Sequence, residues 1–576
     1  MGARFEATGG NDRAPFTLKV RRGEGMALVS MDWREGEPPD DFVGFEIERK
    51  EPKVDFRPLR NRIAFPTADG KVDPKTKRSD LSPFQKFRWV DFPSNPEVEG
   101  EFEYRVTPVF MDAKGALSYG EEAQTAAVVL GGDTYPELNV AFTRGFVSSQ
   151  AFVDRFADED DSIADLIPEE GAEGLTFKAT NPKAEEAWSW MGFEARRAIL
   201  GLLDEALVDP DAQVRVVAYD FNLPELVDRL EKLGDRVKVI IDDSVDEHSK
   251  GHGEADSAES QAATRLKASA GVDGVKRQHM ASLQHNKTIV VSGPKAKGAV
   301  CGSTNLSWRG FFVQSNNAVV LREEAAIEAF IEAFDSYWDH SDDAAGFAAT
   351  GSAEPIDLKL EDIDAHLTFS PHSSHNAQLA GIAADIDTTE SSLLYSLAFL
   401  SQTPGKVRNA IQRATDDDAT FVYGVTDKGT GGIEVHKPDG NVLPASPAAL
   451  TEHVPEPFKS EPKGGGGARM HHKFVVIDFD KPTARVHFGS YNFSISADTK
   501  NGENLLLIRD RRIATSYAIE ALRIFDHYHF RVVDQEAKDV DETLTLKPAP
   551  SEPGEEPWWK PYYTTPAKIR DREVFA

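Results

Sequence analysis

The sequence predicts an all-β sandwich followed by a duplicated α/β architecture. Two segments far apart in the chain repeat one pattern: His-x-Lys, four strand-like residues, then Gly-Ser-x-Asn. Each pattern is preceded by strand-like segments that alternate with a helix-like one, an order typical of α/β units. The first part of the chain instead has short runs in which apolar and polar residues alternate. We therefore expect three folded units, 1–132, 133–345 and 346–536, and a C-terminal tail, 537–576.

The amino-terminal unit is predicted from its alternating segments. Residues 44–47 and 102–106 place apolar side chains at every second position, which indicates strands with one buried face. Together with Trp33, these strands resemble a fibronectin type III sandwich, an immunoglobulin-like all-β fold. Because such modules present surfaces more often than they catalyse reactions, we expect residues 1–132 to have no catalytic role.

The α/β part shows the same order of elements twice. Strand-like segments flank a helix-like segment in each half: 214–218, 223–233 and 237–241, and then 393–398, 407–414 and 420–425. Strands alternating with helices predict a mostly parallel sheet with helical cover. The repeat supports duplication of a whole α/β unit.

The repeated motifs share a histidine, a lysine, a Gly-Ser pair and an asparagine. The first motif contains His285, Lys287, Gly302, Ser303 and Asn305. The second contains His471, Lys473, Gly489, Ser490 and Asn492. The residue that follows the strand is Ser292 in the first and Asp478 in the second. Packing gives no reason for such a repeat, which indicates one active site assembled from two half-sites.

This pattern resembles the phospholipase D superfamily, whose signature is His-x-Lys-x4-Asp followed by Gly-Ser-x-Asn. The resemblance covers roughly residues 136–533 and implies a pseudo-dimer of two α/β halves. The second motif matches in full, whereas the first has Ser292 where the family has an aspartate that is generally structural. We expect an altered but competent first half; the rival interpretation is a degenerate half.

The two motifs carry the groups that cleavage of a phosphodiester needs. Residues i and i+2 of a strand face the same side, so each histidine projects with its lysine. Lysine and amide donors can stabilise the charge on the non-bridging oxygens in the transition state. One histidine would attack phosphorus, forming a phosphohistidine. The other would protonate the leaving alcohol and then activate water or another alcohol.

The division of labour depends on a third residue after each motif, which backs a histidine in families of this kind. These residues are Glu503, a carboxylate, and Asn316, a neutral amide. In the relatives considered closest, the backing residue comes from the opposite half. That arrangement pairs Glu503 with His285 as nucleophile and Asn316 with His471 as acid and base. Backing within each half would swap the roles.

Composition limits the remaining choices. The net charge of −31 argues against broad nucleic-acid binding through overall charge, and the only cysteine, Cys301, excludes an intrachain disulfide. The sequence shows no membrane-spanning run and no signal peptide, so we expect a soluble protein, cytoplasmic or exported without such a peptide. His248 and His252 lie in a polar stretch and are interpreted as solvated. No metal or cofactor is therefore expected.

The leading functional interpretation is a metal-independent phosphodiesterase that releases the headgroup of a phospholipid. Transfer of the phosphatidyl group to an alcohol is a further expected reaction. Two alternatives stay open: a nuclease of the same superfamily acting on DNA or RNA, and a catalytically impaired binding protein. The expected partners are a phosphodiester substrate and, peripherally, a membrane surface. The chain is expected to act as a monomer, and the headgroup stays open.

Overall fold

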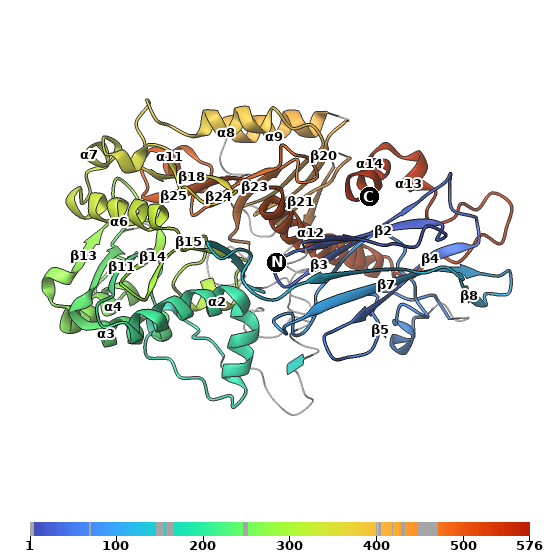
Figure 1. The fold of residues 1–576 in the computed structure, drawn as a ribbon, viewed down its shortest axis with the longest axis horizontal. Coiled ribbons are helices and arrows are strands. Elements are labelled where there is room, and N and C mark those ends of the chain that lie inside the picture. Colours follow the sequence, from blue (N-terminus) through green and yellow to red (C-terminus); the bar gives the residue numbers. More distant parts are fainter. Residues whose placement is uncertain are drawn as a thin grey trace.

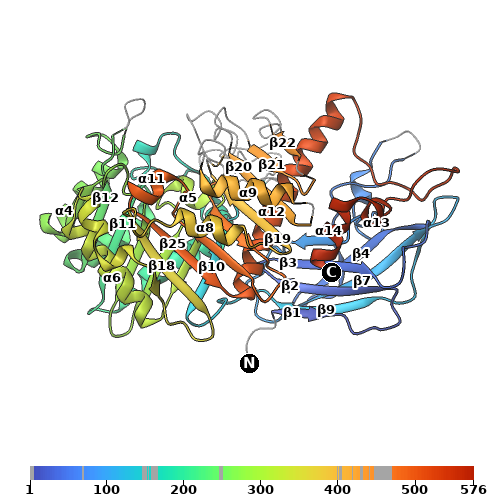
Figure 2. The same ribbon diagram turned by 90° about the horizontal axis from the view of Figure 1, so that it is seen from above.

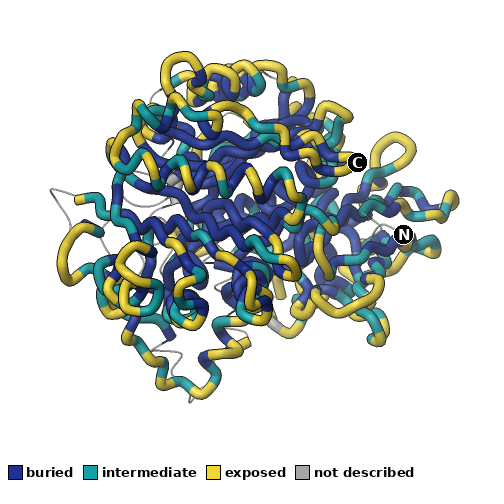
Figure 3. Tube along the Cα trace, turned by 60° about the vertical axis from the view of Figure 1, so that its left-hand side comes forward, coloured by how far each residue is buried: buried dark blue, intermediate teal, exposed yellow. Residues whose placement is uncertain are grey.

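The computed structural model describes residues 5–67, 71–145, 152, 155–156, 166–245, 251–398, 400, 405–417, 419–427, 433–439, 441–445 and 470–576. Figure 1 shows a β-rich body at the amino-terminal end of the chain beside two α/β bodies, and the carboxyl-terminal helices return to the first body. A buried layer runs through all three bodies (Figure 3).

The amino-terminal body consists of two sheets in which all strand pairs are antiparallel. One sheet has the order β1 (Glu6–Thr8), β2 (Phe16–Arg22), β3 (Ala27–Trp33), β6 (Arg88–Asp91). The other has the order β5 (Arg57–Pro58), β4 (Phe42–Lys50), β7 (Glu101–Met111), β8 (Leu117–Tyr119), with β9 (Gln124–Val129) also paired to β7. Phe45 and Tyr104 lie in their shared core, as the alternation predicts. The fibronectin type III assignment stays a prediction.

The first α/β half contains one sheet of seven strands. Their order is β10 (Leu138–Phe142), β16 (Asn317–Leu321), β15 (Lys297–Gly302), β14 (Lys287–Ser292), β11 (Gln213–Ala218), β12 (Val237–Asp242), β13 (Val275–Gln278). The described helices of this half are α2 (Ala184–Val208), α3 (Pro224–Leu233), α4 (Ala258–Ala270), α5 (Trp308–Phe312), α6 (Glu324–Asp339) and α7 (Ala344–Ala348). Helix α2 contacts β10 and β16, and α6 contacts β14 and β15.

The second half contains a sheet of nine strands. Their order is β17 (Ile356–Asp357), β18 (Asp364–Ser370), β25 (Glu503–Arg509), β24 (Arg485–Gly489), β23 (Lys473–Ile477), β19 (Ser392–Leu397), β20 (Phe421–Asp427), β21 (Ile433–His436), β22 (Val442–Ala445). In the part of this half that the structure describes, the helices are α8 (Leu379–Ile386), α9 (Lys406–Asp416), α11 (Ile495–Thr499) and α12 (Arg511–Asp539). Figure 2 shows α8 and α9 together on the outer side of this half.

The two sheets repeat one topology, which agrees with duplication of a whole α/β unit. The order β10-β16-β15-β14-β11-β12 in the first corresponds to β18-β25-β24-β23-β19-β20 in the second. The expectation of a mostly parallel sheet is wrong: in the described chain, parallel ladders join only β11, β12 and β13, and β19 with β20. Each motif strand is antiparallel to both of its neighbours. A short turn between β14 and β15 permits this, because antiparallel strands need no crossover helix.

Helix α12 and the tail join the second half to the sandwich. Helix α12 contacts β19, β20 and β24 of its own sheet and also β2 and β6 of the sandwich. The tail forms α13 (Pro561–Thr564) and α14 (Pro566–Phe575). Three tail aromatics lie in the sandwich core: Trp558, Trp559 and Tyr562. Among the described helices, none is both long and apolar enough to cross a membrane.

Candidate active site

The two motif strands meet where the halves face each other. The residues just before each motif histidine lie beside the other half, at the loop that comes just before Glu503 or Asn316. Gly502 N–H donates to Leu283 O at 2.9 Å, and His471 N–H donates to Ser315 O at 3.2 Å. Two main-chain links of the same kind, one in each direction, therefore set the halves in register.

Each histidine is hydrogen-bonded by the other half, as cross-pairing predicts. His285 Nδ1 lies 2.7 Å from Glu503 Oε2. His471 Nδ1 lies 2.9 Å from Asn316 Oδ1 and 3.0 Å from Ser303 O. Because these partners accept hydrogen bonds, each ring carries its proton on Nδ1 and keeps Nε2 for chemistry. The two rings lie 6.4 Å apart, centre to centre.

The Gly-Ser pair of each motif fixes the backing residue of its own half. Ser490 Oγ donates to Glu503 Oε2 at 2.7 Å, and Ser303 Oγ donates to Asn316 Oδ1 at 2.9 Å. Gly302 has a φ of +126°, and a Cβ there would lie 2.6 Å from Asn317 O. Only glycine fits so close to the neighbouring chain at a positive φ.

The two lysines are buried beside the histidines. Lys473 Nζ donates to His471 O at 2.7 Å, and Lys287 Nζ donates in the same way to His285 O. The Lys287 ammonium also lies 4.8 Å from the centre of the Tyr219 ring. Burial lowers the pKa of Lys287 to about 8, although Glu503 and Asp220 oppose this shift. This ammonium is thus poised to lose its proton slightly above neutral pH.

The motif asparagines differ in their environment. Asn305 is buried and its amide N–H donates to Asp220 Oδ2, whereas Asn492 is partly exposed. The Oδ1 atoms of both side chains have no hydrogen-bond partner. An amide nitrogen carries two N–H groups, so Asn305 keeps one donor beyond its bond to Asp220.

Burial and charge separate the two imidazoles. Burial lowers the pKa of His285, while the Glu503 carboxylate acts in the opposite direction. Burial, with Lys473 and Lys287 adding to it, holds the pKa of His471 well below its usual value. A bound phosphodiester anion would neutralise the lysines and favour the charged form of His471. The two rings are therefore chemically unequal in one cleft.

The residue between the histidine and lysine of each motif points away from the cleft and ties the halves together. Asn504 Nδ2 donates to Asn286 Oδ1 at 2.9 Å, and Asn317 Nδ2 lies 3.3 Å from His472 Nδ1. His472 Nε2 lies 2.9 Å from Glu520 Oε1 on α12. No role was predicted from the sequence for Asn504 and Asn317, although each directly follows a backing residue.

Comparison with known proteins assigns both halves. Residues 203–338 and 388–525 match the family model described as "Cardiolipin synthase, PLD-like domain". Each half of the chain thus contains a segment that matches a phospholipase D-like domain. Over 47 residues it is 49% identical to the phospholipase D of Rickettsia prowazekii (strain Madrid E), an alignment covering 8% of this chain and 21% of that protein. The predicted resemblance to the phospholipase D superfamily is thereby confirmed at the level of the domain.

Two solved structures of lower similarity show how far the likeness extends. The phosphatidylserine synthase of Haemophilus influenzae Rd KW20 is 13% identical, with a TM-score of 0.42, over 58% of this chain and 85% of the other. The phospholipase D family member Nuc of Salmonella typhimurium is 26% identical, with a TM-score of 0.20, over 26% of this chain and 89% of the other.

In each phospholipase D-like domain a carboxylate links the ends of two neighbouring strands, but it comes from a different segment in the two domains. In the second domain Asp478, which is fully buried, accepts from Ser391 N–H at 2.8 Å, so it ties the end of β23 to the start of β19. In the first domain Asp209 precedes β11 and accepts from Lys295 N–H at 2.8 Å and Ala296 N–H at 3.0 Å. The same two segments are joined from the opposite side, which explains how Ser292 is tolerated.

One interpretation from the sequence is wrong at His252. This residue is not a solvated loop histidine: its Nδ1 lies 2.8 Å from Asp242 Oδ2, and its Nε2 lies 3.2 Å from Asp220 Oδ1. Asp220, His252 and Glu259 could each offer an atom to a metal ion. Burial opposes a charge on the ring, but its bonds to Asp220 and Asp242 prevail and raise the pKa of His252 to about 10. His248 lies outside the described residues.

Proposed function

We propose that the protein is a metal-independent phosphodiesterase that releases the headgroup of a phospholipid through a phosphohistidine on His285. The observation that carries the proposal is the unequal backing of the two histidines. A carboxylate lies 2.7 Å from His285, and an amide lies 2.9 Å from His471. A carboxylate stabilises the cation that develops on the attacking ring, whereas an amide only orients its ring.

In the first step the Nε2 lone pair of His285 attacks phosphorus and the bond to the leaving alkoxide breaks. The Nδ1 proton is held by Glu503, which stabilises the imidazolium of the phosphohistidine. His471 starts protonated and gives its Nε2 proton to the alkoxide. The free alcohol leaves, and His471 is left neutral.

In the second step His471 accepts a proton from water, whose oxygen attacks the phosphohistidine. The P–N bond breaks, the electron pair returns to His285 Nε2, and the products are a phosphate monoester and the starting enzyme. An alcohol can replace water in this step, giving transfer of the phosphatidyl group instead of hydrolysis. Lys287, Lys473 and the two motif asparagines stabilise the charge on the non-bridging oxygens in both steps.

Phospholipid is the preferred substrate class over nucleic acid. The net charge of −31 opposes approach of a polyanion that carries one charge per nucleotide. The 47-residue match to proteins named phospholipase D supports the same choice. An impaired binding protein is disfavoured because both histidines and both lysines lie where the halves face each other. A nuclease remains the alternative that the substrate experiment addresses.

The mechanism is tested by locating the covalent intermediate. The protein is mixed briefly with a phosphorus-labelled substrate, quenched without acid and digested, and the label is expected on the peptide that contains His285. His285→Ala should give no label, whereas His471→Ala should still be labelled by a substrate whose leaving group needs no proton. Label on His471 in the wild type would overturn the assignment.

The substrate class is tested by parallel assays in EDTA on phosphatidylcholine and phosphatidylglycerol vesicles, DNA and RNA. Headgroup release from vesicles, at a rate well above cleavage of either nucleic acid, is the expected result. Preferential cleavage of DNA or RNA that is lost in both histidine variants would establish the nuclease alternative. Loss of vesicle activity in EDTA with recovery on adding a divalent ion would overturn the metal-independent mechanism.

A further inference from the structure

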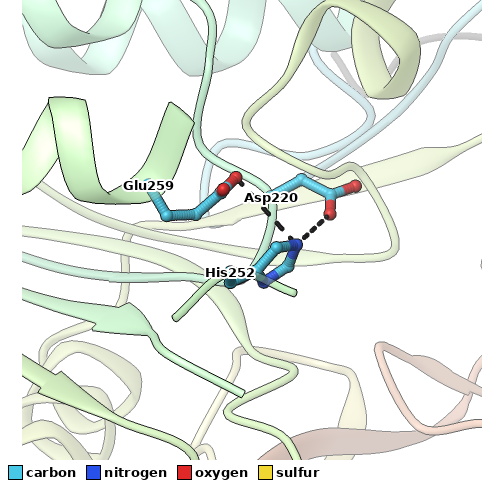
Figure 4. Close-up of side chains that lie close together, drawn as sticks. All are labelled: Asp220, His252 and Glu259. Atoms are coloured by element: carbon cyan, nitrogen blue, oxygen red, sulfur yellow. Dashed lines mark ion pairs between the residues drawn. The ribbon is translucent and has the colours of Figure 1, made fainter. Parts of the chain in front are cut away.

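A third histidine lies beside the first half-site in a cage of carboxylates. Figure 4 shows His252 pointing toward Asp220, with Glu259 close to it. His252 Nε2 lies 3.2 Å from Asp220 Oδ1 and 4.0 Å from Glu259 Oε1. On the other side of the ring, Nδ1 lies 2.8 Å from Asp242 Oδ2, a fully buried carboxylate. The ring is therefore held from both nitrogens.

This cage contacts two parts of the proposed catalytic machinery. Asp220 uses its second oxygen, Oδ2, to accept the amide N–H of Asn305. The Tyr219 ring lies between two imidazoles, 4.5 Å from that of His252 and 4.7 Å from that of His285. Asp242 Oδ1 also accepts the N–H of Gln284, the residue before His285. The position of His252 is thus linked to both Asn305 and His285.

The sequence of the second half has no counterpart of Asp220, although Asp427 occupies the position of Asp242. Ala218 pairs with Lys287, and Leu397 pairs with Lys473, so these two strand positions correspond. The residues that follow are Tyr219 and Asp220 in the first half but Ala398 and Phe399 in the second. Asp220, the carboxylate that joins His252 to Asn305, is therefore particular to the first half and is not required by the duplicated fold.

The hydrogen bonds favour an imidazolium over a bound metal ion in the cage. Both nitrogens of His252 face carboxylates, which can only accept, so the ring must donate from both and carry a positive charge. Glu259 Oε1 is already engaged, accepting the N–H of Phe221 at 2.9 Å. Each of the three residues that could ligate a metal thus already has a hydrogen-bond or ion-pair partner within the protein.

We propose that His252 is a positioning residue of the first half-site. Its charge compensates Asp220, which lies next to the place where the phosphodiester anion would bind, and it holds Asp220 as the acceptor that orients Asn305. Without His252, Asp220 would lose the cation that contacts it, and its negative charge would repel the substrate. This role rests on the function proposed above, because it presumes that Asn305 and His285 act on a phosphodiester.

The test is a double-mutant cycle between His252 and Asp220. His252→Ala is expected to lower kcat/KM about 30-fold, the scale on which a charge-assisted hydrogen bond acts. Asp220→Asn keeps an oxygen that can accept from Asn305 and removes the charge. Adding it to His252→Ala should therefore restore kcat/KM to within about fivefold of the wild type. His366→Ala removes another histidine paired with an aspartate, 2.8 Å from Asp364, and serves as the matched control with wild-type kinetics.

Recovery of kcat/KM in the double variant distinguishes a positioning role from a packing role. If His252→Ala acted only through lost packing, its loss in kcat/KM would add to that of Asp220→Asn. His252→Gln, which keeps the bulk of the side chain, gives the same loss and the same repair if His252→Ala fails to fold. A double variant as slow as His252→Ala overturns the proposal. The proposal is also overturned if EDTA abolishes the activity and Zn²⁺ or Mn²⁺ restores it in the wild type but not in His252→Ala. The cage would then be a metal site.

Binding of inorganic phosphate, followed by ³¹P nuclear magnetic resonance, distinguishes this proposal from the proposed function. His252→Ala is expected to weaken phosphate binding about tenfold and the double variant to regain it, whether or not the protein turns over a lipid. If the wild type cleaves no phosphodiester yet shows this pattern, the proposed function fails and the charge compensation stands. If the wild type is active and phosphate binding does not respond to His252, the positioning role is wrong.

Discussion

Replacing Glu503 with glutamine is the most direct perturbation of the proposed division of labour. Glu503 is fully buried, and its Oε2 lies 2.7 Å from His285 Nδ1 and 2.7 Å from Ser490 Oγ. Its other oxygen accepts from Asn501 Nδ2 at 3.1 Å. Glutamine preserves the volume and one acceptor for His285 but removes the negative charge.

The loss in rate can be bounded from this geometry. A hydrogen bond to a charged group contributes about 1.5–3 kcal/mol and a neutral one about 1 kcal/mol, so the attack step should lose at least ~0.5 kcal/mol, or about twofold. Coulomb attraction between the imidazolium and the carboxylate, at ~4 Å and an effective dielectric constant of ~20, is about 4 kcal/mol. This value sets an upper bound of about 1000-fold on the loss.

The assay is the pre-steady-state burst of leaving-group release, which reports attack before the phosphohistidine is hydrolysed. Glu520→Gln is the matched control, because Glu520 is also fully buried and lies 2.9 Å from a histidine, His472, behind the cleft. The burst rate should fall between about 2- and 1000-fold in Glu503→Gln and remain close to wild type in Glu520→Gln. An unchanged burst in Glu503→Gln, or equal losses in both variants, would refute the reasoning.

Three further outcomes are expected. Because the pKa of Lys287 is about 8, its positive charge is lost as pH rises through this value. Phosphate binding, titrated from pH 6 to 10, should therefore weaken above ~8, and Lys287→Gln should remove that step. Deleting residues 1–132 would uncover the tail aromatics and break the 3.0 Å pair of Arg88 with Asp526, so calorimetry should show a lower melting temperature even though no site residue is lost. Turnover of bis(p-nitrophenyl) phosphate should be unchanged after dialysis against EDTA, because the lysines supply the positive charge.

The order of elements could be predicted from the sequence, but the direction of the strands could not. Apolar periodicity is local, and it located β11, α3 and β12 to within a residue or two. Whether a strand runs parallel or antiparallel depends on its neighbour in the sheet, which the local pattern does not encode. The short connection between β14 and β15 was the available signal, because a turn of a few residues can only return the chain antiparallel.

The half-sites could be predicted because they repeat, and the cage could not because it does not. His285, His471 and their backing residues have matched spacing, so each motif supported the other. Asp220, Asp242 and His252 lie at the ends of β11 and β12 and in the segment before α4, and only the fold brings them together. A histidine in a polar stretch resembles a solvated one until its partners are placed. Asp209, which takes the role of Asp478 in the first half, could not be predicted either, because only the fold brings it to Lys295 and Ala296.

The two halves have diverged in the placement of charge more than in their backbones. The topology, the lysine–carbonyl bonds and the serine bonds to the backing residues are the same in both. What differs is that His285 is bonded to a carboxylate and lies beside the cage, whereas His471 is bonded to an amide and a carbonyl. Two identical imidazoles can perform opposite tasks only if their surroundings favour different charges at the same moment. In the proposed mechanism, the duplicated fold supplies a symmetric frame, and substitutions at a few positions around it assign attack to one ring and proton transfer to the other.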